Sequence, residues 1–289
     1  MGVTTPSDSP AVLHQERTLY TEDGLRLATE RWQPTEADVR VELLVVPGYA
    51  DHAARYRDMA HALAPLGIAL TALDPRGHGR SEGPRGHVGR YEEYHLDVRA
   101  ALGALELGRP RFVLGHSQGA LIVLDALMHN ALPGELAGLV LTSPFLDLAL
   151  RVPPWKVAVS DLAGRYVPRL ALPSGLLPSS LSHDEAEVQA YARDPLVFKT
   201  ATAGWFAAVK LAQARVMQLR ALRMPLLLYY SPDDAIALAS ATARFVEQVA
   251  VGDKTVHIRA GEGHEPQHEL ERAGLFKDIG AWVLAHRAG

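Results

Sequence analysis

An apolar segment that ends in a serine with small neighbours constrains this chain more than any other feature. Residues 111–116 are mostly apolar and lead into Ser117, which has a glycine two positions before it and another two positions after it. The following residues 120–128 have helical character, so Ser117 is predicted to lie where a buried strand turns into a helix, as a Gly-x-Ser-x-Gly motif requires. Such a turn strains the serine backbone and lifts the hydroxyl clear of the sheet. The motif predicts a nucleophilic serine, although a glycine-rich turn in any doubly wound protein has a similar pattern.

The remainder of the chain predicts a mostly parallel sheet. Further short apolar segments, separated by stretches with helical spacing, occur at residues 41–46, 67–74, 139–143, 225–230 and 254–259. Strands that are apolar along their whole length are typical of a parallel sheet with helices on both faces. Before them, residues 15–21 and 25–32 alternate in part around a Glu-Asp-Gly turn, which predicts a β-hairpin.

One long stretch interrupts this alternation of strands and helices. Between Ser143 and Met224 there is no convincing strand, and the segment is rich in Leu, Ala, Pro and aromatic residues. A structureless loop of that length is improbable in a compact domain, so an inserted helical subdomain is predicted. We therefore predict a disordered tail at residues 1–10, a core formed by residues 11–145 and 223–289, and a helical cap at residues 146–222.

An acid and a histidine follow two of the later strands. Asp233 and Asp234 come after residues 225–230, and His264 comes after residues 254–259. In parallel sheets the functional residues lie just beyond the carboxyl ends of the strands. A serine hydroxyl needs an imidazole to take its proton and a carboxylate to orient that imidazole, so the order Ser, Asp, His predicts a catalytic triad. We favour Asp234 over Asp233, because the Ala-Ile-Ala after it suits a turn that enters a helix.

Two backbone N–H groups are predicted to stabilise the oxyanion of a tetrahedral intermediate. Gln118 follows the nucleophile and supplies one of them, and Tyr49, in the loop after residues 41–46, supplies the other. We expect the His116 side chain to point away from Ser117, on the other side of the turn.

His264 also begins a His-Glu-Pro-Gln-His string that matches the zinc-protease motif H-E-x-x-H. That motif needs both histidines on one face of a continuous helix, which Pro266 and the glycines before His264 disfavour. We therefore predict no metal and place His268 at the surface or behind the site.

Composition and charge exclude several classes of protein. The formal charge is −4, from 29 basic and 33 acidic residues without a basic stripe, so nucleic acid is not an expected partner. The chain has no cysteine, which excludes disulfides, thiol catalysis and cysteine-bound metal. The first ten residues have no basic and apolar leader pattern, and no uninterrupted apolar stretch of about 18 residues could span a bilayer. We therefore expect a cytoplasmic enzyme.

Together these residues closely resemble the serine-hydrolase branch of the α/β-hydrolase superfamily that contains monoacylglycerol lipases and bacterial lysophospholipases. Besides the Gly-His-Ser-Gln-Gly motif, the resemblance rests on Pro-Gly-Tyr-Ala-Asp-His, Asp-Pro-Arg-Gly-His-Gly-Arg-Ser-Glu-Gly, Leu-Ser-His-Asp and Tyr-Ala-Arg-Asp-Pro-Leu-Val, at residues 47–52, 74–83, 181–184 and 191–197. It implies the α/β-hydrolase fold and a serine esterase that hydrolyses lipid esters with one acyl chain, either monoacylglycerol or lysophospholipid. It also implies an acyl-enzyme intermediate and no metal or cofactor.

The resemblance has one departure, in the loop that carries Tyr49. This chain has Pro47 where the family usually has His, and Asp51 where Glu is common. We expect the backbone donors to survive these changes, and a hydrogen bond that braces the loop to be missing.

The predicted cap supplies candidate residues for substrate binding. Trp155, Leu177, Trp205 and Phe206 are predicted to line an acyl channel, although each could instead pack the cap onto the core. Exposed apolar residues of the cap also suggest transient contact with a membrane surface. The same scaffold serves carboxylesterases, thioesterases and aminopeptidases, and a non-catalytic ligand-binding protein is a further alternative. The sequence leaves the head group, the acyl length and the oligomeric state open.

Overall fold

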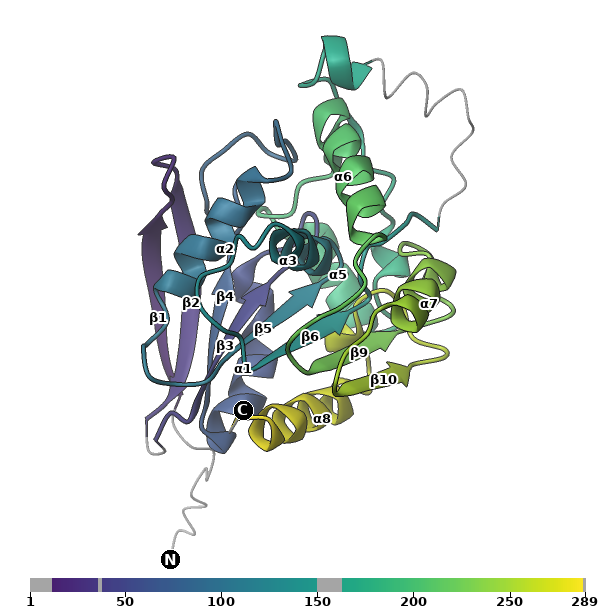
Figure 1. Ribbon diagram of the computed structural model, residues 1–289. Coiled ribbons are helices and arrows are strands. Elements are labelled where there is room, and N and C mark those ends of the chain that lie inside the picture. Colours follow the sequence, from purple (N-terminus) through teal and green to yellow (C-terminus); the bar gives the residue numbers. More distant parts are fainter. Residues whose placement is uncertain (1–11, 36–37, 150–162, 288–289) are drawn as a thin grey trace, which may run out of the picture.

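The computed structural model describes residues 12–35, 38–149 and 163–287, drawn in colour in Figure 1. The predicted tail at residues 1–10 and the predicted channel residue Trp155 lie outside these ranges. Every helix within them is too short or too polar to cross a membrane.

A single eight-stranded sheet forms the centre of the core (Figure 1). Its strands run in the spatial order β1-β2-β4-β3-β5-β6-β9-β10. The antiparallel hairpin β1–β2 occupies one edge and β2 is antiparallel to β4, whereas all other neighbours are parallel. The bounds are Val12–Tyr20 for β1, Arg26–Pro34 for β2, Val41–Val46 for β3, Ile68–Leu73 for β4, Arg111–His116 for β5, Gly138–Thr142 for β6, Leu226–Tyr230 for β9 and Lys254–Ile258 for β10. The predicted hairpin and mostly parallel sheet are confirmed.

Helices cover both faces of this sheet, because the central strands are apolar on both sides. In β3, Leu43 and Val45 pack into one apolar cluster, and Leu44 and Val46 pack into the other, as the alternation of side chains along a strand requires. The first face is covered by α1 (Arg57–Leu63) and α8 (Arg272–Ala285), and the second by α2 (Glu93–Gly103), α3 (Gln118–Met128), α6 (Ala203–Val216) and α7 (Ala239–Gln248). The fold is the doubly wound α/β arrangement that the sequence predicted.

The predicted cap region contains a small sheet as well as helices. Among its described residues, the two longest helices are α5 (Glu185–Arg193) and α6, whose first turn lies above the core in Figure 1. Two three-residue strands, β7 (Ala171–Pro173) and β8 (Thr200–Thr202), pair antiparallel. The prediction that this stretch has no strand is therefore wrong, because strands of only three residues are too short to show an alternating pattern in the sequence.

Candidate active site

Ser117 stands at a sharp turn between β5 and α3. Its backbone has φ 52° and ψ −115°, a conformation that is rare for a residue with a side chain. The turn is held because the Ser117 N–H donates to the carbonyl of Thr142 at 2.9 Å, at the end of the neighbouring strand β6. A Cβ atom at Gly115 would lie 2.6 Å from the Ala120 Cα, and one at Gly119 would collide with the Val46 carbonyl. The small residues of the motif are therefore required by the close passage of strand, helix and neighbouring loop.

The side chains of His264 and Asp234 complete a hydrogen-bonded chain with Ser117. His264 Nε2 lies 2.7 Å from Ser117 Oγ, and His264 Nδ1 lies 2.7 Å from Asp234 Oδ2. All three residues are buried, and they arrive on three separate loops after β5, β9 and β10. The other Asp234 carboxylate oxygen accepts the N–H groups of Ile236 and Ala237. Because both carboxylate oxygens are engaged, the orientation of the Asp234 side chain is fixed.

Asp233, the alternative acid, points elsewhere. Its carboxylate accepts the N–H of Gly261 at 2.8 Å and its side chain is exposed, so it ties two loops together outside the buried chain of contacts. The geometry thus separates the two neighbouring carboxylates into different tasks.

The electrostatics of the site keep the acid charged. Burial opposes ionisation of Asp234, but attraction to His264 and the hydrogen bonds it accepts lower its pKa below the usual value. His116 lies beside this pair, with its ring centroid 5.2 Å from that of His264. Burial lowers the pKa of His116 to about 4, and repulsion from the neighbouring His264 adds to this effect. The His116 ring is therefore neutral near pH 7.

The prediction that His116 points away from Ser117 is wrong, because the ring lines the same cavity as the serine. The left-handed turn at Ser117 interrupts the alternation of side chains, so two successive residues face one space. His116 Nδ1 lies 3.1 Å from the Thr142 hydroxyl, which holds the ring in this place.

The zinc-protease string does not form a metal site. Both ring nitrogens of His264 are engaged by Ser117 and Asp234, and only Pro266–His268 is helical, as a single 3₁₀ turn. His268 is buried, with Nδ1 3.4 Å from the Glu187 carboxylate. It thus lies behind the site, on the side that α5 covers.

Within the described ranges, one other cluster has the spacing of metal ligands, formed by His95, Asp125 and His129. The Asp125 carboxylate is already occupied, because Arg215 Nε and Nη2 each lie 2.9 Å from one of its oxygens. The guanidinium therefore supplies the positive charge that a cation would bring.

Tyr49 and Gln118, the predicted oxyanion donors, border the serine. Gln118 is the first residue of α3, so its backbone N–H has no acceptor within the helix. The Tyr49 loop lies directly against the nucleophile, because a Cβ atom at Gly48 would meet the Ser117 Cβ at 3.3 Å. Ala50, with φ 57°, turns the chain sharply after Tyr49. Both residues thus lie beside the nucleophile, and their role as oxyanion donors stays a prediction.

A buried ion-pair network braces the Tyr49 loop. Asp51 accepts from Arg55 at 2.8 Å and from the Tyr56 hydroxyl at 2.9 Å. Arg55 in turn donates to both carboxylate oxygens of Glu265, at 2.9 and 2.6 Å. At Asp51 the expectation of a missing brace is therefore wrong, because this shorter side chain still reaches two partners.

This network also determines the charges beside His264. Burial would raise the pKa of Asp51 and of Glu265, but attraction to the Arg55 guanidinium outweighs it and lowers both. Since Glu265 follows His264 in the chain, Arg55 joins the loop of the predicted oxyanion donor to the loop of the predicted base. Arg55 and Glu265 lie 210 residues apart in sequence, so no local signal could have revealed the link between the two loops.

A cavity of about 240 Å³ opens beside Ser117 and His264. Its walls are mainly apolar and include Phe145, Leu148, Leu176, Trp205, Phe206 and Ile236. Trp205 and Phe206 were predicted channel residues. Leu177 was as well, but its side chain is 63% exposed and its neighbour Leu176 contributes to the wall instead.

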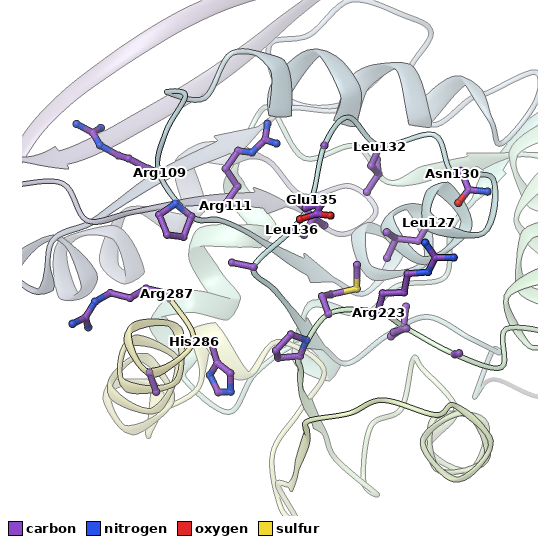
Figure 2. A pocket seen from close by; sticks show the side chains of 18 of the residues that line it. Arg109, Arg111, Leu127, Asn130, Leu132, Glu135, Leu136, Arg223, His286 and Arg287 are labelled. Atoms are coloured by element: carbon purple, nitrogen blue, oxygen red, sulfur yellow. The ribbon is translucent and has the colours of Figure 1, made fainter. Parts of the chain in front are cut away.

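A larger cavity, of about 1030 Å³, lies at the opposite end of the central strands (Figure 2). Arginine and leucine side chains surround it, among them Arg111, Arg223, Leu127 and Leu132. It is formed before β5, β6 and β9 rather than after them, and none of Ser117, Asp234 and His264 reaches it. Size alone therefore does not identify the reactive site.

Comparisons with known proteins agree with this geometry. The profile of the family described as serine aminopeptidase S33 matches residues 37–271. A monoacylglycerol lipase of Mycolicibacterium smegmatis is 32% identical over 91% of this chain and 94% of its own length. The human monoglyceride lipase is 32% identical over 93% of this chain and 90% of its own. The crystal structure of a Paleococcus ferrophilus monoacylglycerol lipase has a TM-score of 0.81 at 29% identity, over 90% of this chain and 99% of that one.

The fold and the comparisons define an α/β hydrolase of the serine-hydrolase class. The match over residues 37–271 is well over half of the chain. The chain belongs to the serine aminopeptidase S33 family, and the relatives named monoacylglycerol lipase and monoglyceride lipase confirm the resemblance that the motifs indicated.

Proposed function

We propose that this chain is a monoacylglycerol lipase, which hydrolyses carboxylic esters with one acyl chain through an acyl-enzyme on Ser117. The observation that carries the proposal is the Ser117–His264–Asp234 chain of contacts, both of 2.7 Å, at the mouth of an apolar cavity. Relatives that bear the names monoacylglycerol lipase and monoglyceride lipase support the substrate class.

In this proposal His264 Nε2 takes the Ser117 proton as the hydroxyl attacks the ester carbonyl. Asp234 accepts from Nδ1–H and stabilises the imidazolium that forms. The N–H groups of Tyr49 and Gln118 bind the oxyanion, and each such donor typically lowers the barrier by about 3 kcal/mol. His264 then returns the proton to the leaving glycerol oxygen. Water, deprotonated by the same imidazole, releases the fatty acid in the second half of the cycle.

The cavity provides the place for the acyl chain. Trp205 and Phe206 approach from α6, and Phe145 and Ile236 approach from the loops after β6 and β9. Because the walls are mainly apolar, transfer of an acyl chain from water into the cavity is favourable. A polar substituent would lose its hydrogen bonds to water there, so the cavity favours lipid esters over polar ones.

We further propose that the cap touches a membrane surface while the enzyme remains cytoplasmic. Exposed apolar side chains gather in one short stretch of the cap, at Tyr166, Val167, Leu170, Leu172 and Leu177. The test is co-sedimentation with zwitterionic liposomes. We expect the double variant Leu177→Glu, Tyr166→Glu to lose most of the liposome-bound fraction that the wild type shows. The control Leu107→Glu, at an 86% exposed leucine beside the opposite cavity, should bind as the wild type does. Equal binding of all three proteins would reject cap-mediated contact.

A hydrolysis panel tests the reaction and its substrate. Wild type and Ser117→Ala would receive p-nitrophenyl esters of rising chain length, a monoacylglycerol, a lysophosphatidylcholine and an aminoacyl amide. We expect monoacylglycerol to be turned over fastest and the variant to lose about 10⁶-fold in kcat. Thermal unfolding of both proteins controls for folding. Turnover that does not depend on Ser117 would refute the triad, and faster turnover of the lysolipid or the amide would reassign the substrate.

A further inference from the structure

One cap side chain, Trp205, contacts both residues that carry the proposed oxyanion donors. It lies in the first turn of α6, where its own backbone N–H donates to the Thr202 hydroxyl at 3.2 Å. Its indole ring reaches Gln118 on one side and Tyr49 on the other. These two residues come from different loops of the core, so Trp205 connects them from the cap.

The contact with Gln118 is a directed hydrogen bond. Trp205 Nε1–H donates to Gln118 Oε1 at 2.7 Å, and both side chains are buried. An indole nitrogen can only donate, so the amide oxygen has to face the indole and the amide orientation is fixed. Gln118 begins α3 directly after the nucleophile, so a bond that anchors its side chain also holds the backbone turn next to Ser117.

The contact with Tyr49 is made by ring packing. The centroids of the Trp205 and Tyr49 rings are 3.9 Å apart with an interplanar angle of 34°. The Tyr49 hydroxyl donates to the Thr200 carbonyl at 2.9 Å, in strand β8 just before α6. Tyr49 is thus held to the cap at its ring and at its hydroxyl, and the preceding Gly48 lies directly against Ser117.

We propose that Trp205 is a positioning residue that sets the separation of the two oxyanion donors, so that the donors are aligned only while α6 is seated on the core. The inference rests on the proposed function and adds to it a coupling between the cap and the chemical step. Oxyanion stabilisation requires donors within a few tenths of an ångström of their ideal positions, so a loosened Tyr49 or Gln118 weakens the transition state more than the bound ester.

Two conservative variants isolate the hydrogen bond. Trp205→Phe keeps an aromatic ring against Tyr49 but lacks the N–H, and Gln118→Met keeps the length and the backbone N–H but lacks the acceptor. We expect each to lower kcat about tenfold and to change KM by less than about twofold. The double variant should lose no more than either single variant, because both remove the same bond.

Inhibition by an alkyl trifluoromethyl ketone distinguishes two roles of Trp205, the positioning of the oxyanion donors and the packing of the acyl chain. This inhibitor forms a tetrahedral adduct with the serine, so its Ki should rise by the factor by which kcat/KM falls. The matched control is Leu211→Ala, at an exposed position of the same helix, which should leave kcat, KM and Ki unchanged.

Several results would overturn the inference. A Trp205→Phe enzyme with wild-type kcat would do so, as would a raised KM at unchanged kcat, or additive losses in the double variant. A wild type that hydrolyses none of the esters would instead refute the proposed function. The two failures are therefore distinguishable.

Discussion

The two ends of the sheet make an instructive contrast. At the amino ends of β5, β6 and β9 lies the cavity of about 1030 Å³, and at the carboxyl ends lies one of about 240 Å³. The larger is bordered by the arginines of Figure 2, two of which donate to backbone carbonyls, as Arg287 does to Leu284 at the end of α8. Guanidinium groups near helix ends complement the partial negative charge of exposed carbonyls. This accounts for Arg287 without a ligand.

The carboxyl ends differ because their loops are bonded to one another. Arg55 joins the loop after β3 to the loop after β10, and Asp74, after β4, accepts the Ala53 N–H at 2.7 Å. Asp234 ties its own turn to His264. Convergence of several fixed loops, and not empty volume, is what makes one end suitable for chemistry.

The largest effect is expected when two neighbouring aspartates after β9 are replaced one at a time. Asp234→Asn should lower kcat/KM about 10⁴-fold, because the imidazole loses the partner that fixes its tautomer. Asp233→Asn should stay within about threefold, since its carboxylate bonds only the Gly261 N–H at the surface. Steady-state kinetics with a soluble ester measure both, and similar losses in the two variants would contradict the assignment.

A smaller effect is expected when the bond between two loops is removed. Arg55→Gln leaves Asp51 and Glu265 buried without their cation, which should lower the free energy of unfolding by about 3 kcal/mol near neutral pH. Urea denaturation followed by fluorescence measures the difference.

The pH dependence of that difference has a definite sign. In the native protein the pKa values of Asp51 and Glu265 are lowered, so they stabilise the fold above their unfolded pKa values near 4 and cease to do so as the pH falls through the folded values. Without Arg55, burial raises both pKa values. As the pH falls, the two carboxylates of the variant are therefore protonated before those of the wild type, and the variant loses the cost of two buried, unpaired charges. The gap in stability should therefore narrow between about pH 7 and about pH 5. A gap that widens would argue against the network.

The smallest effect is expected at the amino end. Arg223 is exposed and borders the larger cavity, so Arg223→Ala should change the free energy of unfolding by less than about 0.5 kcal/mol and leave kcat/KM as it is. The same kinetic and denaturation assays apply. A loss of activity here would mean that the two ends are coupled, and would remove the contrast.

Local sequence patterns were enough to predict the central sheet and the three candidate catalytic residues. Apolar strands and the residues just after them indicated the sheet and brought Ser117, Asp234 and His264 together as candidates. Contacts between distant segments leave no periodic pattern, so the Arg55 network, the Trp205–Gln118 bond and the short strands of the cap were not foreseen. Two side-chain directions were predicted wrongly for a related reason. A shift of one residue puts Leu176 in the cavity wall in place of Leu177, and the left-handed turn at Ser117 brings His116 to the same cavity as the serine.

The shared guanidinium of Arg55 also bears on how this protein can change over generations. A substitution at Asp51 alters the charge balance felt by Glu265, and the reverse also holds, because one cation serves both. Mutational effects at these two positions should therefore be epistatic. Descendants of this lineage would replace all three residues in concert or retain them together, even while the surrounding surface diverges.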